Sequence, residues 1–470
     1  MLFSTPIFLF FFFPLTYLTW SLWRKAGDIV LLVASVIFYG WSQSKYLPLV
    51  TIAIVANYLF ARGIAQEDSR DGKKSILIGA TIFNISILFI FKYLGFSLRS
   101  INELLAHFGM SVRVVEFALP LGISFFIFHC MSYIFDVYRG HAACQRPVRF
   151  FLYILLFPQL IAGPIIRYKD IAHQFGMNRP TGLSAAEGLR RFSVGLAKKV
   201  LIANEMGRIS DQLFGRSDLD TASAWAAVVC YTLQIYFDFS GYSDMAIGMM
   251  KMFGFVVPEN FNYPYISQSI KEFWRRWHIS LSTWFRDYLY IPLGGNRLGD
   301  GRTVFNVMLV FTVSGLWHGA SWNFIVWGLW HGFFVIVESY GPKLRLLDRR
   351  PLRHLYALLV VMVGWVIFRS DDLVQAASLL HKMCFQDQTS TSPGFLRLYF
   401  SPYSASIALV AIVGATPIPG MLWQRLFDAS RVKGRAYILS FKELAAILLF
   451  GLSASAMSGD FYNPFIYFNF

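Results

Sequence analysis

Charged residues are scarce in this sequence. Lys, Arg, Asp and Glu make up 15% of its 470 residues, whereas apolar residues make up 56% and aromatic residues 18%. A soluble domain carries about 25% charged residues, because water must wet its surface. So few charges cannot cover the surface of a soluble protein of this length. The composition therefore predicts a polytopic membrane protein.

The sequence also lacks the motifs of several enzyme classes. It has no G-x-S-x-G nucleophile elbow, no P-loop and no dinucleotide-binding glycine pattern. Its four cysteines (Cys130, Cys144, Cys230 and Cys384) show no CxxC spacing, and its nine histidines show no HExxH spacing. We therefore expect no disulfide framework, no metal site and no resident cofactor.

The charge that is present is mostly positive. The 42 Lys and Arg residues exceed the 27 Asp and Glu residues, which gives a net charge of +15. In a membrane protein, basic residues ordinarily hold cytoplasmic loops on the inner side, so nucleic acid is not an expected partner. A funnel for an anionic, phosphate-bearing substrate is a second use of the same charge.

Apolar segments recur along the chain and predict an all-α membrane fold. They cover residues 2–22, 28–44, 46–62, 76–95, 117–136, 148–166, 222–239, 304–317, 321–340, 354–369, 404–422 and 442–457. Several are shorter than the roughly 20 residues of a full span. We therefore expect about eleven transmembrane helices together with short re-entrant or tilted ones. Since no polar linker could hold a second domain, residues 1–470 are predicted to form one integral domain with a catalytic core at about 117–340.

The basic loops predict the orientation of these helices. They follow the first, third and fifth segments and contain Arg24, Lys25, Arg62, Arg70, Lys73, Lys74, Arg139, Arg146 and Arg149. Cytoplasmic loops are enriched in Lys and Arg, so these loops should be inside and the N-terminus outside. The loop with Lys92, Arg99 and Arg113 is a mild exception. Residues 2–22 lack a basic leader and a cleavage site, and we interpret them as a retained span.

Residues 251–302 are neither apolar enough to span nor polar enough for a plain loop. Their apolar residues recur at three- and four-residue steps, which predicts an amphipathic helix: Trp274, Trp277, Leu281, Trp284 and Tyr288. Arg275, His278, Ser282 and Arg286 fall on another face. The helix either lies at the membrane interface or dips into the protein with its cationic face along a pocket.

Two histidines lie within apolar segments. His318 follows one apolar run and precedes another, and Trp330-His331-Gly332 repeats the triplet Trp317-His318-Gly319. An intramembrane imidazole is costly, so each is a functional candidate as well as a possible packed polar residue. Thirteen steps of about 100° place the two on different faces of one helix. They can converge only if the helix breaks near residues 319–323.

A second polar cluster covers residues 231–244 and includes Asp238 and Asp244. The two carboxylates lie six residues apart across a Ser-Gly pair. Because buried charges are usually paired, we interpret this cluster as a hinge whose acids bind the arginines of residues 271–302.

Five ordered blocks carry a family resemblance. They are residues 120–125, 157–164, 236–244, 273–278 with 294–297, and 315–319. Together they resemble the membrane-bound O-acyltransferase family, in particular the bacterial branch that acetylates exopolysaccharides such as alginate. The resemblance extends over nearly the whole chain.

The resemblance implies a ring of spanning helices around shorter tilted ones in the bacterial inner membrane. It implies that His318 is the essential histidine and that the segment with Trp277 and His278 is its companion site. The donor would be cytoplasmic acetyl-CoA, and a periplasmic partner similar to SGNH hydrolases would receive the acetyl group. The candidate residues are catalytic His318 and His278, with Arg275, Arg276, Trp277, Arg286, Asp238, Trp317 and His331 binding the donor or lining its channel.

Other functions stay open at this point. Within the family they are D-alanyl transfer to teichoic acid and acyl transfer to peptidoglycan, and acetylated cellulose rivals alginate as the acceptor. From another class, a polysaccharide or lipid-linked-sugar transporter would also need many spans, but it should show an internal repeat of hydropathy. The short Trp-His-Gly repeat alone does not provide one.

The cationic face of residues 271–302 gives a first prediction. We expect the combined substitution of Arg275, Arg276 and Arg286 by Ala to weaken acetyl-CoA binding in detergent. Lys replacements should restore it only in part, because Arg binds phosphate oxygens in a bidentate fork. Binding measured against salt concentration tests this. An unchanged affinity would leave these arginines as lipid anchors.

Overall fold

The computed structural model describes residues 2–141, 146–161, 163–176, 181–216, 218–341, 349–385, 398–430, 432–459 and 462–464, without the side chains of 432–439. Throughout these residues the secondary structure is helical, with no strand. The first half of the chain forms α1 (Phe13–Leu22), α2 (Gly27–Gln43), α3 (Leu47–Gln66), α4 (Arg70–Leu88), α5 (Leu94–Leu105), α6 (Ile123–Tyr138), α7 (Pro147–Leu155), α8 (Phe157–Leu160), α9 (Tyr168–Ile171), α10 (Gly182–Ala197) and α11 (Asn204–Phe214). The second half forms α12 (Thr221–Met252), α13 (Ile270–Arg276), α14 (Ile279–Phe285), α15 (Asp300–His318), α16 (Trp322–Tyr340), α17 (Arg350–Arg369), α18 (Leu373–Cys384), α19 (Pro402–Gly414), α20 (Ile418–Ala429) and α21 (Val432–Gly459).

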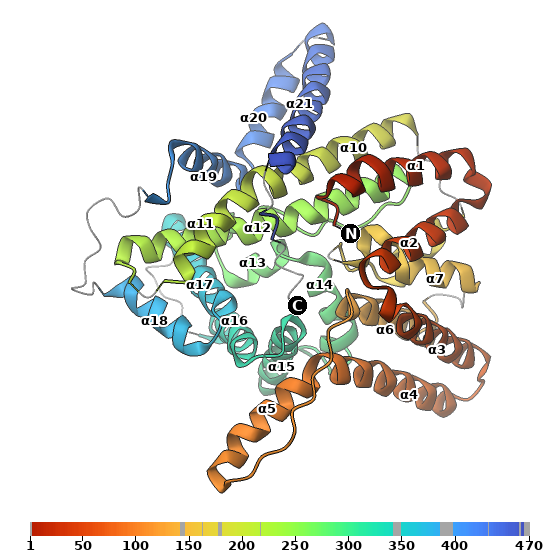
Figure 1. Cartoon of the computed structure of the whole chain (residues 1–470). Coiled ribbons are helices and arrows are strands. Elements are labelled where there is room, and N and C mark those ends of the chain that lie inside the picture. The colour runs from red at the N-terminus through yellow and green to blue at the C-terminus, as the bar shows by residue number, and fades with distance from the viewer. Residues whose placement is uncertain are drawn as a thin grey trace.

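The helices surround a centre that contains the shortest ones. Figure 1 shows α1–α4 and α7 on one side and α16–α18 on the other, with α12, α13 and α14 between them. Helix α12 is buried along most of its length, as expected of a helix that is apolar all round and enclosed by others. Helices α20 and α21 project beyond the rest at one edge and α5 at the opposite edge (Figure 1).

Each predicted apolar segment contains a helix in the structure, so the all-α fold is confirmed, although residues 117–122 lie before the start of α6. Two segments are broken: residues 148–166 divide into α7 and α8, and residues 404–422 divide into α19 and α20 at a 67° bend. Helices α10 and α11 were not predicted. The expected count of about eleven spans is not confirmed, because four helices in the described part are long and apolar enough to cross a membrane, or five with the bent pair.

The predicted amphipathic helix is wrong as one element. The segment forms α13 and α14, which are separated at Trp277 and His278, and then the π-helical turn η9 (Arg286–Tyr290). Aromatic side chains on both sides of the break are buried. Their spacing in the sequence is therefore that of one helix, although the backbone is not helical across the break.

The hinge predicted around Asp238 and Asp244 is also wrong, because α12 runs unbroken through both residues. Asp238 pairs with Lys199, with 2.7 Å between Oδ1 and Nζ, and both side chains are 2% exposed. Asp244 pairs with Arg191 and Lys198. The partners of these acids therefore come from α10 and the π-helical turn η7 (Lys198–Ala203), not from residues 271–302.

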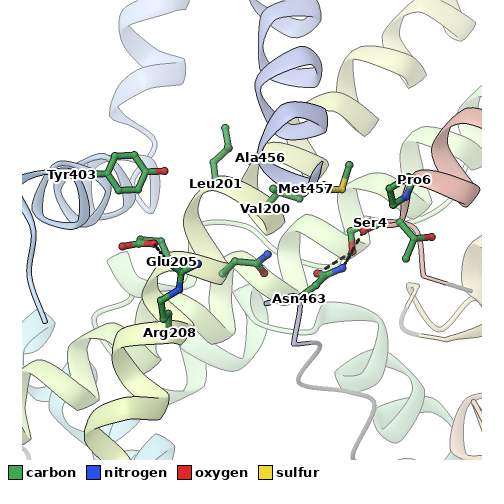
Figure 2. Close-up of a pocket in the computed structure, with 12 residues that line it drawn as sticks. Ser4, Pro6, Val200, Leu201, Glu205, Arg208, Tyr403, Ala456, Met457 and Asn463 are labelled. Atoms are coloured by element: carbon green, nitrogen blue, oxygen red, sulfur yellow. Dashed lines mark hydrogen bonds and ion pairs between the residues drawn. The ribbon is translucent and has the colours of Figure 1, made fainter. Parts of the chain in front are cut away.

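Residues near both ends of the described part of the chain meet between the helices. Ser4 and Asn463 exchange side-chain hydrogen bonds of 3.1 and 3.2 Å. Beside them lies a cavity of about 390 Å³ that is also lined by Glu205 and Arg208 of α11 and by Tyr403 of α19 (Figure 2). Segments that are far apart in the sequence are thus joined by side-chain contacts.

Helices α10 and α12 approach closely at pairs of glycines. A Cβ atom on Gly248 would lie 2.6 Å from the carbonyl oxygen of Gly188, and one on Gly195 would lie 2.6 Å from that of Gly241. Small residues allow helices to pack in a membrane without a hydrophobic driving force. These glycines bring the basic residues of α10 and η7 within reach of the acids of α12.

This packing gives a stability prediction. We expect Gly248→Ala to destabilise the protein by about 1–3 kcal/mol, because the added methyl group meets backbone atoms that cannot move aside. Gly40→Ala in α2 is the matched control, since its Cβ would have no atom within 4 Å, and alanine favours a helix by up to about 1 kcal/mol over glycine. Thermal unfolding in detergent compares the two. Equal melting temperatures would contradict the close-packing argument.

Candidate active site

His278 lies at the break between α13 and α14 and has a strained backbone. Its φ of 43° and ψ of 53° place it in the left-handed region, which few residues other than glycine adopt. The neighbouring chain holds this conformation: the Ile279 N–H donates to the Asn260 carbonyl (3.0 Å), and the Asn262 N–H donates to the Arg276 carbonyl (2.9 Å). Such strain occurs preferentially at functional sites, where surrounding contacts maintain it.

The Asn260 side chain fixes the orientation and tautomer of the His278 ring. Its Oδ1 accepts from the Ser280 hydroxyl (2.9 Å) and lies 3.1 Å from His278 Nδ1, while its Nδ2 donates to Ser243 (2.9 Å). Since an amide oxygen only accepts, Nδ1 carries the proton and Nε2 keeps its lone pair. Nε2 is buried and has no hydrogen-bond partner among the described residues. His278 is therefore arranged as a neutral imidazole with one basic nitrogen available.

His318 lies at the last residue of α15 and is 3% exposed. Its ring packs edge-on against Trp317, Trp327 and Phe368, at centroid distances of 4.9, 5.0 and 5.3 Å. Helix α15 ends there, and residues 319–321 form a non-helical connection to α16. The helix break near residues 319–323, on which a convergence of His318 and His331 depends, is thus present.

The three candidate histidines lie in one row with two tryptophans between them. Trp317 contacts both His278 (6.1 Å between centroids) and His318, and Trp327 contacts both His318 and His331 (5.2 Å). The structure therefore brings together residues that are far apart in sequence. His278 and His318 border the same indole, whereas Trp327 separates His331 from them.

His331 is enclosed by rings. Phe273, Trp274, Trp327 and Trp365 surround it, and neither of its ring nitrogens has a hydrogen-bond partner in the described part of the chain. A Cβ atom on Gly364 would lie 2.7 Å from its Nε2. This packing fits the structural alternative for His331 better than a role in proton transfer.

The arginines predicted to bind the donor do not converge on one point. Arg275 is exposed, Arg276 binds Glu272 (2.9 Å) and the Asn262 carbonyl, and Arg286 binds Asp287 (2.7 Å). Burial favours the neutral form of Asp287, but Arg286, with Arg167 and Lys169, lowers the pKa of its carboxyl below the usual value. Arg286 also borders an apolar cavity of about 180 Å³ beside Trp274 and Ser314.

A larger cavity borders the residue that orients His278. It has a volume of about 1110 Å³, and Asn260 and Ile279 line it together with eight charged residues. Five of these are cations (Arg190, Arg191, Lys198, Lys251 and Lys442) and three are acids (Glu187, Asp244 and Glu259). Arg191, Lys198 and Lys251 pair with these acids, and Arg190 pairs with Glu443. A cavity with an excess of basic residues thus reaches Asn260.

Sequence reasoning missed Asn260, Ser280 and Lys92 as parts of this site. Asn260 lies in a stretch without a recognisable motif, and Ser280 belongs to neither face of the predicted helix, which does not exist as one element. Lys92 falls within the predicted apolar segment 76–95 but entered only the argument on orientation, as part of a basic loop. An intramembrane charge is itself a functional signal and could have identified it.

Comparison with known proteins adds the family. The sequence profile of the membrane-bound O-acyltransferase family matches residues 122–368, which include all three histidines of the row. The chain belongs to this family. As a membrane-bound O-acyltransferase it is 40% identical, over the full length of both chains, to a probable alginate O-acetylase of Azotobacter vinelandii.

Two further relatives differ in their acceptors. A peptidoglycan O-acetyltransferase of Helicobacter pylori is 36% identical over 82% of this chain and 80% of its own. A teichoic acid D-alanyltransferase of Streptococcus thermophilus is 30% identical over 47% of this chain and 56% of its own. The protein is therefore a membrane O-acyltransferase. Its family membership favours this activity over the transporter hypothesis.

The hydrogen bonds of Asn260 give a prediction for the site. We expect Asn260→Leu to lower acyl transfer by about 100-fold, because His278 loses the acceptor that fixes its tautomer. The matched control is Asn102→Leu, which removes an amide that bonds only the backbone of Val112 far from the row. Rates are compared at equal amounts of folded protein. Near-wild-type activity of Asn260→Leu would show that the orientation of His278 does not matter.

Proposed function

We propose that this protein takes acetyl groups from cytoplasmic acetyl-CoA and passes them across the bacterial inner membrane for O-acetylation of an exopolysaccharide. The observation that carries the proposal is the pair of buried histidines on one indole, His278 and His318, beside a cavity that reaches Asn260. An imidazole is suited to accept a hydroxyl proton near neutral pH.

In the proposed step, His318 is the general base. A hydroxyl oxygen of the acceptor attacks the thioester carbonyl carbon as its proton passes to His318. The C–O ester bond forms, the C–S bond breaks, and the CoA thiolate leaves with the proton returned by the imidazolium. His278, held by Asn260, is the companion group, with Trp317 between the two rings.

The donor is proposed to enter from the side of the basic loops. The phosphates of acetyl-CoA would bind Arg275, Arg276 and Arg286 or the cations of the large cavity, where Arg190 and Lys442 lie near Trp423. The thioester end would then extend past Asn260 to the histidine row. Asp238, which is paired with Lys199, is also proposed to lie along this channel.

The proposed acceptor is inferred from the similar proteins. Full-length similarity to a probable alginate O-acetylase favours an alginate-like polysaccharide. Cellulose and peptidoglycan are alternatives, and D-alanyl transfer is less favoured because the similarity to the teichoic acid enzyme covers about half of each chain. A periplasmic partner similar to SGNH hydrolases would complete the transfer. The N-terminus is proposed to be periplasmic, opposite the basic loops.

The buried position of His318 predicts a relay. A hydrated polymer cannot easily reach a side chain that is 3% exposed, so we expect a hydroxyl on the partner, or on a segment inserted from outside, to accept the acetyl group first. The purified protein alone should hydrolyse acetyl-CoA slowly and leave polysaccharide unmodified. Addition of the partner should restore transfer.

His318→Ala tests the chemistry in the same assay. We expect it to abolish transfer at near-wild-type thermal stability, whereas His278→Ala and His331→Ala should lose less activity or lose it together with folding. The measurement is labelled acetyl in polymer with and without the partner. A stable, fully active His318→Ala protein would remove the catalytic assignment, and efficient acetylation by the chain alone would remove the relay.

A further inference from the structure

The end of α15, which carries His318, is capped by side chains from another helix. Between α4 and α5 lies the π-helical turn η4 (Phe89–Tyr93). The Tyr93 hydroxyl donates to the Leu316 carbonyl (2.9 Å), and Lys92 Nζ donates to the Trp317 carbonyl. The last carbonyls of a helix have no partner within the helix, so donors from outside stabilise its end. Two adjacent residues of η4 thus fix the backbone immediately before His318.

Both residues belong to a π-helical turn. Such turns occur frequently at functional sites.

Lys92 differs from Tyr93 in one respect, which is its charge. It lies within a helix long and apolar enough to cross a membrane, where a cation is costly. It also donates to the Ser124 hydroxyl (3.1 Å), but no carboxylate among the described residues pairs with it. Tyr93 shows that a neutral hydroxyl is sufficient to cap a carbonyl here. The charge of Lys92 therefore needs an explanation besides capping.

The position of the charge supplies that explanation. Lys92 binds the carbonyl of Trp317, the residue next to His318, and His278 contacts the ring of the same Trp317. The ring contacts described on the neighbouring helices are aromatic. Helix α17 presents Phe368, α6 presents Phe125 and Phe128 to Trp317, and His331 of α16 lies beyond Trp327. A cation in this place opposes a second positive charge on His318.

We infer that Lys92 is a positioning residue for His318: it holds the end of α15 in place and keeps the imidazole in the neutral form that can accept a proton. This inference rests on the proposed function of His318 as general base. It assigns the charge of Lys92 an effect on pH dependence that a merely structural lysine would not have.

Variants at η4 separate the two effects. Transfer of labelled acetyl groups from acetyl-CoA is measured from pH 5 to pH 9 in membranes of the native host, which contain the protein's own partners. In Lys92→Met, imidazolium forms more easily, so we expect activity to be lost as the pH falls at a midpoint about one pH unit higher than in the wild type. Lys92→Arg keeps the charge and should keep the wild-type midpoint. Tyr93→Phe should lower the rate without moving the midpoint.

Lys45→Met is the matched control, because Lys45 is an exposed lysine that contacts the Tyr46 ring. We expect its rate and midpoint to equal those of the wild type. If Lys92→Met fails to accumulate, Lys92→Gln retains an amide donor for the Trp317 carbonyl without the charge and should show the same shift.

A wild-type midpoint in the neutral variants would overturn the inference, whatever happens to the rate. His318→Ala distinguishes this failure from that of the proposed function. If His318→Ala is inactive and the midpoint does not respond to Lys92, only the role of Lys92 is wrong. If His318→Ala is active, the general base itself is wrong.

Discussion

The structure depends on one constraint, which is that a polar group inside a membrane must find its partner within the protein. Water is absent there, and an unsatisfied donor, acceptor or charge costs several kcal/mol. Much of the described interior follows this rule, and His331 and the Nε2 atom of His278 are exceptions to it. Asn57 and Asn84 bond each other across α3 and α4, Lys199 pairs with Asp238, and Asn260 binds three neighbours. These contacts fix which helices lie side by side.

The same constraint explains why the functional groups lie at helix ends. A helix interior satisfies its own backbone, whereas a helix end exposes carbonyl and N–H groups that require other segments. His318 ends α15 and His278 precedes α14, and both ends are held by hydrogen bonds from distant parts of the chain. Interrupted helices thus create the polar positions that chemistry needs. Hydrogen bonds from the surrounding segments offset the cost of these interruptions. Trp317 and Trp327 lie between the imidazoles and pack against them.

The sequence predicted what depends on local pattern. Apolar segments of sufficient length contained helices, and the spacing of the two Trp-His-Gly triplets made a break between them the condition for bringing their histidines together. Helices α10 and α11 escaped detection because charged residues interrupt their apolar pattern. Arg191 of α10 and Lys198 and Lys199 of η7 find their acidic partners on α12. The break at His278 escaped because aromatic residues continue at helical steps across it. No sequence pattern marks Asn260, because its role depends on hydrogen bonds between its loop and the residues around His278.

The ion pairs between α12 and its neighbours also concern how the protein is made. A carboxylate or a lysine at the centre of a helix opposes insertion by the translocon by about 2.5–3.5 kcal/mol. Helix α12 carries Asp238 and Asp244, and the segment before it carries Lys198 and Lys199. Neither segment is suited to enter the bilayer alone, but together they neutralise each other across the glycine contacts. We therefore expect the ribosome to complete α12 before α10 and η7 leave the translocation channel, so that the pair partitions into lipid as one hairpin.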